Sequence, residues 1–305
     1  MTVVIAAVAI VKFKLDGEAV SIEGDPNMAE MATVDCQVEG LFVYPFKSAR
    51  GHAREAVRLG PTGFEWDRHW MGVDRKGTFI SQRTHPRLAL LIPEIENETL
   101  VLRAPQLPDL RVPLSADSGT RVRVRVFEHE CAALDQGDGA AQWLSRFLGE
   151  DLRVVRVIAK PERLANPQYA GPVPKPITFV DGYQMLVCNR ASLEELNTRM
   201  PKPVPMERFR PNIVLGGLPA FAEDRIDSLM LGDITLRLVK PCTRCIITST
   251  DQRTGERSTN PLPVLRTYRL DPVLHGVKFG ENAVIVAGVG SRLHTGCMAK
   301  VTFNS

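Results

Sequence analysis

The sequence lacks a strong excess of charge of either sign. Its 38 Lys and Arg residues nearly balance 35 Asp and Glu residues, which gives a formal net charge of +3 at neutral pH. Domains that bind nucleic acid usually carry a marked basic excess, so this balance argues against a nucleic-acid partner. A local basic pocket for an anionic ligand remains compatible with so small a net charge.

Cysteine is scarce and irregularly spaced. The 305 residues include six cysteines, and only Cys242 and Cys245 lie close together. Small secreted proteins that depend on disulfides carry denser and more regular cysteines, so we expect a reducing environment and a cytoplasmic protein. Internal repeats, low-complexity segments and glycine-rich phosphate loops are also missing.

Apolar runs long enough for a membrane span are missing as well. The apolar residues 3–11 are too few to cross a bilayer, and no basic residue precedes them as in a secretory signal. We therefore expect no stable membrane span. Residues 12–15 and 18–22 flank Asp16 and Gly17, which favours a β-hairpin. A membrane-associated end and a leader before a true start near Met31 are the alternatives.

The chain is instead rich in short strand-like segments. Its 44% apolar and 24% charged residues are typical of soluble globular proteins, and 305 residues suffice for about two domains. Arginine and valine alternate strictly in residues 121–127, which predicts a strand with its valines on the core. Further strands are predicted at residues 88–92, 99–103, 152–158, 226–231, 234–239 and 283–287. This density is typical of barrels or sandwiches, so the predicted fold class is mainly β with some helix (α+β).

Two segments have helical periodicity. Residues 140–148 end before a glycine, which is a natural helix stop. Ser192 and Glu195 have the spacing of a capping box, so a second helix should run from there to Met200. The proline-rich residues 161–176 are the expected linker.

The motif Cys242-Thr243-Arg244-Cys245 is the most distinctive local feature. A zinc site would need two further ligands, but the histidines form no second paired motif. A thioredoxin-like pair would stand at a helix start, whereas here a strand precedes the motif and the β-branched residues 246–248 follow it. Two ordinary buried cysteines are the simplest alternative. Arg244 beside Cys245 would favour its thiolate, the form that a soft metal binds.

Basic and polar groups elsewhere in the chain suit an anion. Lys47 and Ser48 follow a strand-like run, Arg68 lies between two others, and Arg210 stands close to Asn212. Arginine offers phosphate a planar fork of donors, and lysine offers a point charge. For each group alone, a solvated charge, a surface ion pair or a turn is the simpler interpretation.

Taken in order, these motifs resemble those of a known family. The stretch Tyr44-Pro45-Phe46-Lys47-Ser48, with residues 63–71 and 81–89, resembles the N-terminal β-barrel domain that accompanies MOSC domains. Five further stretches resemble the MOSC domain itself: residues 179–181, 191–197, 209–212, 242–245 and 278–280. The resemblance covers about residues 35–301 and is strongest to the mitochondrial amidoxime-reducing component and its bacterial counterparts. It implies an N-terminal extension (1–33), a MOSC-associated β-barrel domain (34–160) and a MOSC β-barrel domain (161–305).

The resemblance implies a pterin-based molybdenum cofactor. The metal would be held by Cys245, which would also be the catalytic residue. By motif position, the pterin phosphate would be held by Lys47, Ser48 and Arg68. The pterin and the metal would be lined by Ser192, Arg210, Asn212, Thr243 and Arg244. In such an enzyme the cofactor performs the hard chemistry, while the protein supplies orientation and charge.

The resemblance also implies an activity and its partners. The family reduces N-hydroxylated compounds (amidoximes, hydroxylamines and N-hydroxylated bases) with electrons from a separate redox protein. The chain has no clustered cysteines of an iron–sulfur domain, so we expect a separate flavoprotein reductase, ferredoxin or b-type cytochrome as electron donor. We also expect the enzyme to be a monomer. The alternative function is a module that carries molybdenum cofactor, or sulfur as a Cys245 persulfide, without turnover. Two positions depart from the family pattern: Ala191 replaces a hydroxyl residue, and Cys297 follows Gly296 where an aspartate is usual.

Overall fold

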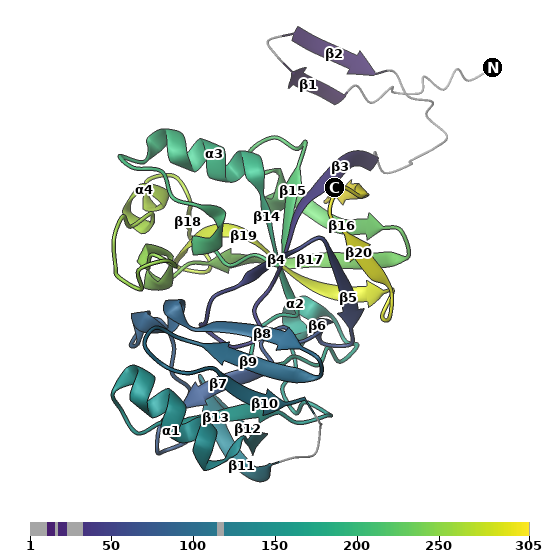
Figure 1. The fold of residues 1–305 in the computed structure, drawn as a ribbon. Coiled ribbons are helices and arrows are strands. Elements are labelled where there is room, and N and C mark those ends of the chain that lie inside the picture. Colours follow the sequence, from purple (N-terminus) through teal and green to yellow (C-terminus); the bar gives the residue numbers. More distant parts are fainter. Residues whose placement is uncertain (1–10, 16–17, 23–32, 115–118, 305) are drawn as a thin grey trace, which may run out of the picture.

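The fold is described from a computed structural model of the chain. The description covers residues 11–15, 18–22, 33–114 and 119–304 (Figure 1). Within these residues, no helix is both long enough and apolar enough to cross a membrane. Strands predominate and the helices are short, which confirms the predicted class, mainly β with some helix.

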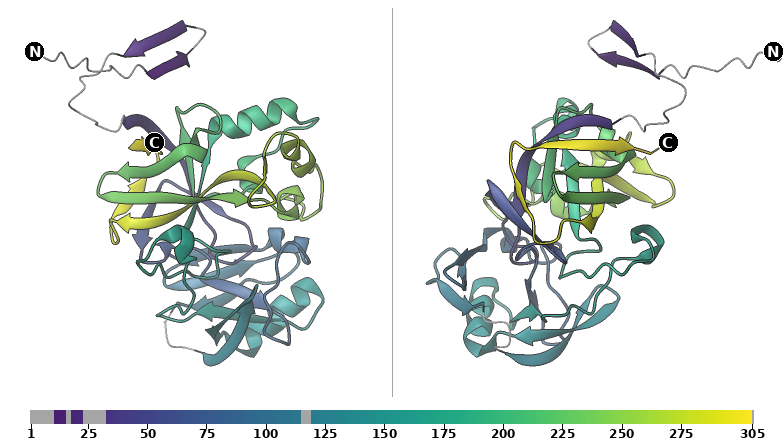
Figure 2. Two further views of the ribbon diagram at one scale, coloured as in Figure 1. Left: turned by 180° about the vertical axis from the view of Figure 1, so that it is seen from behind. Right: turned by 90° about the vertical axis from the view of Figure 1, so that its right-hand side faces the viewer.

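Seven of the described strands form a closed barrel (Figures 1 and 2). They are β3 (Thr33–Val43), β14 (Met185–Asn189), β15 (Ile213–Gly216), β16 (Ile226–Leu231), β17 (Ile234–Thr243), β19 (Gly276–Ala287) and β21 (Met298–Phe303). Their order around the barrel is β14, β15, β3, β21, β16, β17 and β19, and β19 pairs back with β14 to close the ring. Only the pair β14–β15 is parallel.

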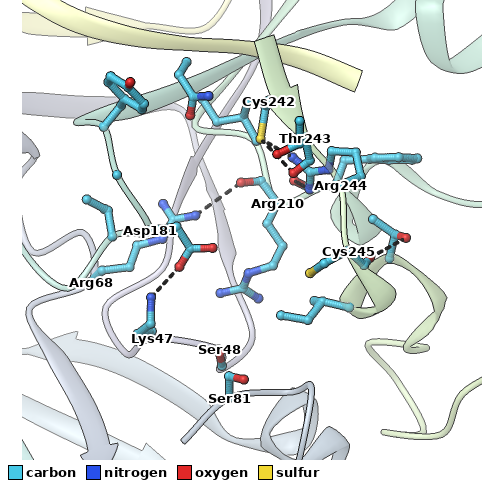
Figure 3. Close-up of a pocket in the computed structure, with 18 of the residues that line it drawn as sticks. Lys47, Ser48, Arg68, Ser81, Asp181, Arg210, Cys242, Thr243, Arg244 and Cys245 are labelled. Atoms are coloured by element: carbon cyan, nitrogen blue, oxygen red, sulfur yellow. Dashed lines mark hydrogen bonds and ion pairs between the residues drawn. The ribbon is translucent and has the colours of Figure 1, made fainter. Parts of the chain in front are cut away.

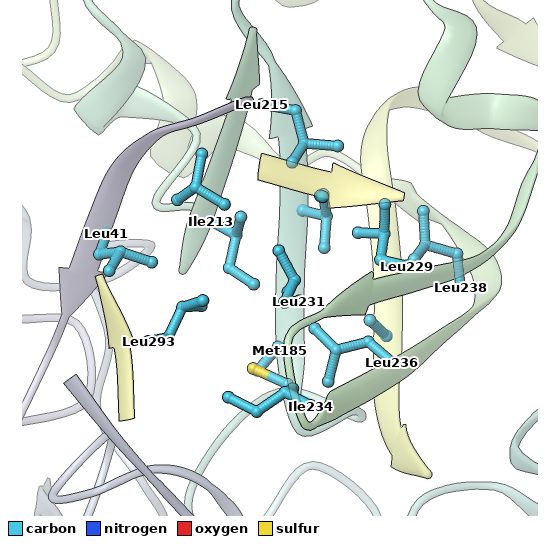
Figure 4. Close-up of a cluster of buried hydrophobic side chains, with 14 of the residues drawn as sticks. Leu41, Met185, Ile213, Leu215, Leu229, Leu231, Ile234, Leu236, Leu238 and Leu293 are labelled. Carbon is cyan, nitrogen blue, oxygen red and sulfur yellow. The ribbon is translucent and has the colours of Figure 1, made fainter. Parts of the chain in front are cut away.

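Aliphatic side chains fill the barrel interior (Figure 4). Alternate residues of each strand point inward, as Leu229 and Leu231 do on β16 and Leu236 does on β17. On the opposite side, Leu41 of β3 meets Ile213 of β15 in the same cluster. Each fully buried leucine or isoleucine stabilises the fold by roughly 2 kcal/mol, so this interior fixes the register of the strands.

Residues 70–157 form a second body, which we call the two-sheet region. One sheet has the order β11 (Thr120–Val126), β12 (His129–Asp135), β13 (Arg153–Val157) and β7 (Trp70–Val73). The other has the order β10 (Leu110–Pro113), β9 (Thr99–Arg103) and β8 (Ile92–Glu96). Helix α1 (Gly137–Leu148) packs on β13 and β10, and its Leu144 and Phe147 join the buried core around Trp70.

The barrel takes strands from both ends of the chain. Strand β3 pairs with β15 and β21, and β4 (His52–Arg54) pairs with β3. Strand β5 (Ala56–Gly60) pairs with β6 (Gly63–Phe64) and with β20 (Arg292–His294). The chain therefore crosses between the barrel and the two-sheet region more than once, and segments from both meet at the junction. The predicted domain boundaries after residues 33 and 160 stay a prediction.

Short elements complete the described chain. The hairpin strands are β1 (Val11–Leu15) and β2 (Glu18–Ile22), with Leu15 opposite Glu18. The turn residues Asp16 and Gly17, the apolar residues 3–10 and Met31 lie outside the described residues. Strand β18 (Leu270–Asp271) pairs with β19. The remaining helices are α2 (Pro167–Ala170), α3 (Arg190–Arg199), α4 (Leu262–Arg266) and the 3₁₀ helices η1 (Pro86–Leu90), η2 (Met206–Arg208), η3 (Ala222–Arg225) and η4 (Ile246–Ser249).

Most of the predicted elements are confirmed, but one predicted strand and the predicted start of the second helix are wrong. Six of the predicted strands coincide with β9, β11, β13, β16, β17 and part of β19, and the first predicted helix is α1. Residues 88–92 are not a strand, because Pro86 opens the 3₁₀ helix η1 with its backbone already set for a helix. Ser192 does not cap α3: the side chain of Asn189 accepts a hydrogen bond from Ala191 N at 3.3 Å, so the helix starts earlier.

Two carboxyl groups are buried where η3 packs against β14 and β19. Glu223 is 0% exposed and Glu281 is 4% exposed, and each has one carboxyl oxygen without a hydrogen-bond partner among the described residues. Burial, together with the nearby carboxylate of Asp224, raises the pKa of Glu281 to about 9. The Glu281 side chain is therefore neutral in the folded protein at neutral pH.

We predict that Glu281 makes the protein less stable as the pH rises. Because the folded pKa lies above that of the unfolded chain, the unfolded state ionises first, and stability falls between about pH 4.5 and pH 9. Glu281→Gln should remove this loss. From pH 5 to pH 8.5, the free energy of unfolding of the wild type should therefore fall by at least about 1.4 kcal/mol more than that of the variant, which is the equivalent of one pKa unit. Urea unfolding at pH 5 and pH 8.5 measures the difference. The exposed Glu194→Gln is the control, and an equal pH dependence in wild type and Glu281→Gln would contradict the prediction.

Candidate functional site

A cavity lies where the barrel meets the two-sheet region (Figure 3). Its wall comes mainly from residues 47–48, 79–83, 180–186, 209–212 and 242–248. These segments are far apart in the sequence and belong to both bodies of the protein. Of the predicted site residues, the cavity wall includes Lys47, Ser48, Arg68, Arg210, Asn212, Thr243, Arg244 and Cys245.

Lys47 is a buried cation at one end of the cavity. Its side chain is 5% exposed, and its Nζ donates to Phe179 O at 2.8 Å and to Asp181 Oδ1 at 2.5 Å. The rings of Phe79 and Phe127 lie 5.1 and 5.4 Å from the ammonium. Burial lowers the pKa of Lys47, and the Asp181 carboxylate opposes that shift.

Two arginines share the ring of Tyr44. The Arg68 and Arg210 guanidiniums lie 4.1 and 4.3 Å from its centroid. Arg68 is also held by Asp67 Oδ2 at 2.5 Å, whereas Arg210 donates to the carbonyl of Ala49 at 2.6 Å. Burial, with the like charge of Arg68, lowers the pKa of Arg210 to about 10. The ring and the carbonyl thus hold together two like charges that repel each other.

Three residues of the cavity wall have left-handed backbone conformations. The φ angles of Ser48, Arg68 and Arg210 are 65°, 51° and 56°. In a residue other than glycine, this conformation costs roughly 1–2 kcal/mol. Hydrogen bonds hold it in place: Arg68 N donates to Tyr44 O at 2.7 Å, and Arg210 N donates to Glu207 O at 3.2 Å. Such strain gathers at functional sites, where the surrounding structure fixes it.

The two cysteines of the motif have different surroundings. The Arg244 guanidinium donates to Cys242 Sγ at 2.8 Å and to Phe209 O at 2.6 Å (Figure 3). Arg244 is therefore paired with Cys242, not with Cys245 as its sequence position suggested. The reason is that alternate residues of an extended segment point to the same side, so Arg244 follows Cys242 rather than its neighbour. Burial raises the pKa of Cys242, which favours its neutral thiol.

Cys245 stands at the end of this extended segment. Its carbonyl accepts hydrogen bonds from Thr248 N at 3.2 Å and Thr248 Oγ1 at 3.0 Å, and so it opens η4. The segment after the motif is thus a 3₁₀ helix, not the strand that its β-branched residues 246–248 favoured. The Sγ atom of Cys245 has no hydrogen-bond partner among the described residues, and it points into the cavity beside Arg210 (Figure 3).

Asn212 and Ser192 were expected to contact a ligand, but the side chains of both are hydrogen-bonded to other groups of the protein. The Asn212 side chain already accepts from Leu186 N and Arg68 at 3.2 Å each, and it donates to Phe42 O. It therefore ties the barrel to Arg68. Ser192 does not belong to the cavity wall: it is fully buried, and its hydroxyl donates to Glu223 Oε2 at 2.8 Å. This placement gives no support to a ligand contact by Ser192.

Arg83 and Asp181 also line the cavity, although sequence reasoning gave them no role. Asp181 binds Lys47, and its own side chain is 66% exposed. Arg83 lies 5.1 Å from the Phe127 ring, and its guanidinium has no hydrogen bond or ion pair with the described residues. Both belong to motifs that resemble the family, which was the available signal. The two departures from the family pattern, Ala191 and Cys297, lie outside the cavity wall.

The cavity wall fits an anionic group that carries a soft metal. Among the described residues, Nη2 of Arg210 is buried without a hydrogen-bond partner, so a guanidinium donor remains for an oxyanion. Lys47, Arg68 and Arg83 add positive charge to the same wall. Cys245 offers a sulfur ligand of the kind that soft metals prefer. Together these groups suit a phosphate at one end of the cavity and a thiolate-bound metal at the other.

Comparisons with known proteins give matches along most of the chain. The model of the MOSC N-terminal beta barrel domain matches residues 35–151, and the model of the MOSC domain matches residues 174–296. The chain is 36% identical over 245 residues to the mitochondrial amidoxime reducing component 2 of Bos taurus, covering 77% of this chain and 73% of the relative. It is 35% identical over 243 residues to the mitochondrial amidoxime-reducing component 1 of Homo sapiens, covering 76% and 72%.

We predict that Arg83 contributes to anion binding without contributing to stability. Arg83→Met removes a cavity cation whose guanidinium has no hydrogen bond or ion pair with the described residues, and a partly exposed charge of this kind is worth up to about 1 kcal/mol, or about fivefold in affinity. Titration calorimetry with inorganic phosphate measures the loss, and thermal unfolding should stay unchanged.

Arg87→Met is the matched control. The Arg87 guanidinium also lies over an aromatic ring, at 5.2 Å from Phe147, but Arg87 does not line the cavity. Equal phosphate affinity in Arg83→Met and wild type, or an equal loss in Arg87→Met, would show that the cavity is not the anion site.

Proposed function

We propose that this chain, which belongs to the family of the mitochondrial amidoxime-reducing components, is a molybdenum-cofactor-dependent reductase of N-hydroxylated compounds. One observation carries the proposal: the Cys245 thiol and the cations Lys47, Arg68 and Arg210 face the same cavity. A family member with this arrangement has both the sulfur ligand for the metal and the positive charge for the phosphate. The relatives' names, which state amidoxime reduction, supply the reaction class.

The roles of the cavity residues follow from their chemistry. Lys47 and Arg68 would hold the pterin phosphate, and the Ser48 hydroxyl, which has no partner among the described residues, would donate to it. Cys245 would hold the metal. The pterin and metal end would be lined by Arg210, Asn212, Thr243 and Arg244. Arg244 would act by fixing Cys242 and the chain before Arg210, because its two terminal nitrogens donate to Cys242 Sγ and Phe209 O.

The proposed reaction removes oxygen from a substrate nitrogen. The N–O bond of the N-hydroxylated substrate breaks, the nitrogen gains one proton, and the hydroxyl gains the other and leaves as water. Two electrons from a separate redox protein and two protons from solvent balance the reaction. Bound molybdenum supplies the two-electron oxygen chemistry. The protein orients the substrate beside Cys245, and its cations stabilise the negative charge of the cofactor.

Two further expectations belong to this proposal. The electron donor would be a flavoprotein reductase, a ferredoxin or a b-type cytochrome. The relatives are named mitochondrial, so the cytoplasmic location expected from the cysteine content stays a prediction.

We predict that the two cysteines differ in metal retention. Cys245→Ser should reduce molybdenum content from near one per chain to less than about a tenth, because a serine hydroxyl is a harder ligand that stays protonated at neutral pH. Cys242→Ser should keep most of the metal, since Cys242 is paired with Arg244. Metal analysis of protein from a cofactor-competent host, with benzamidoxime reduction by a supplied donor, measures both properties.

Three outcomes would contradict parts of the proposal. Equal loss of metal in both variants would favour a zinc or disulfide role for the pair. Stoichiometric molybdenum without any reduction of amidoxime would favour a cofactor carrier. A protein that lacks molybdenum but carries transferable sulfur on Cys245 would favour sulfur delivery.

A further inference from the structure

The loop after η4 is hydrogen-bonded to two segments of the chain that contribute Ser48 and Arg83 to the cavity wall. Arg50 donates to Gln252 O at 2.6 Å, and Arg257 donates to Arg83 O at 2.5 Å. Gln82 and Gln252 exchange hydrogen bonds between their side-chain amides. These contacts join residues 250–257, which follow Cys245 in the chain, to residues 48–50 and 81–83.

The two glutamines form a reciprocal amide pair. Gln82 Nε2 donates to Gln252 Oε1 at 3.1 Å, and Gln252 Nε2 donates to Gln82 Oε1 at 3.0 Å. Gln82 is 0% exposed, so its amide depends on these partners for its hydrogen bonds. The pair spans 170 positions of sequence and so joins parts of the chain that fold as separate segments.

The remaining amide hydrogens connect the pair to Ser48 and to η4. Gln82 Nε2 also donates to Ser48 O at 2.7 Å, and Ser48 is one of the strained residues with positive φ. Gln252 Nε2 also donates to Thr250 O at 3.1 Å, and Thr250 N closes η4 by donating to Ile247 O. Because η4 starts directly after Cys245, a short path of hydrogen bonds leads from Ser48 to the Cys245 segment.

We propose that the Gln82–Gln252 pair is a positioning element that holds the Cys245 segment in register with Ser48, which lines the same cavity. Its use for a cofactor that spans both ends rests on the proposed function. Neither glutamine lines the cavity, so the pair acts through Ser48 and η4 rather than on a ligand. Without it, the segment that starts at Cys245 keeps its contacts to Arg208 but loses its buried attachment to Gln82.

The test is the alkylation rate of Cys245 in cofactor-free protein, measured by mass spectrometry after timed exposure to iodoacetamide. The variants are Gln82→Met and Gln252→Met, which keep side-chain length and remove the amide. Gln252 is the less buried partner, so its variant folds even if Gln82→Met does not. Cys297, which is also partly exposed but does not line the cavity, is the internal reference thiol.

Gln184→Met is the matched control. Gln184 is 1% exposed and also makes three hydrogen bonds between distant segments: to Pro61 O, to Pro176 O and from Ile285 N. None of those three partners lines the cavity. Loss of its amide should therefore cost stability without changing the alkylation of Cys245.

We expect each variant of the pair to raise the Cys245 rate at least about threefold relative to Cys297, because the freed segment opens more often. The double variant should add little, since the two amides act as one unit. An unchanged Cys245 rate, an equal rise in Gln184→Met, or two effects that simply multiply would overturn the inference. Since no step needs molybdenum, the result stands or falls separately from the proposed function.

Discussion

Repulsion between like charges is the constraint on which the site depends. Lys47, Arg68 and Arg210 face one cavity, and the burial of Arg210 beside Arg68 already lowers its pKa. Buried cations of this kind are costly unless partners surround them. The structure supplies Asp67 for Arg68, the Ala49 carbonyl for Arg210, and the Tyr44 ring for both guanidiniums. The wall is thus stable enough to form, yet it keeps positive charge available for an anion.

The path of the chain is what brings these partners together. Strand β3 closes the barrel and then delivers Tyr44, Lys47 and Ser48 directly into the junction with the two-sheet region. Farther along the chain, Arg210 follows η2 and Cys245 follows β17, and both line the same cavity. A cavity built from separate strand ends has no continuous sequence motif, so its residues become a site only after the barrel closes.

Local sequence patterns predicted the secondary-structure elements better than they predicted the contacts between side chains. Strict alternation located β11, and the glycine stop located the end of α1, because both depend on neighbouring residues. The start of α3 was missed because Asn189 competes with Ser192 as a cap, and Glu223 draws the serine inward. Most of the residues that resemblance selected line the cavity, but it could not show that Arg244 binds Cys242 or that the Arg83 guanidinium has no ion pair with the described residues. Those facts depend on which segments meet in space.

The strained residues explain why so much of the structure supports the cavity. Three left-handed residues cost roughly 1–2 kcal/mol each, which is a large share of the marginal stability of a protein. That cost is acceptable where it orders donors before a ligand arrives, because ordering them during binding would weaken affinity instead. Ser48 is fixed through Gln82, Arg68 through Asp67, and Arg210 through Ala49. The cavity is therefore pre-organised by contacts outside it, and substitutions at those supports should affect ligand binding without touching the ligand.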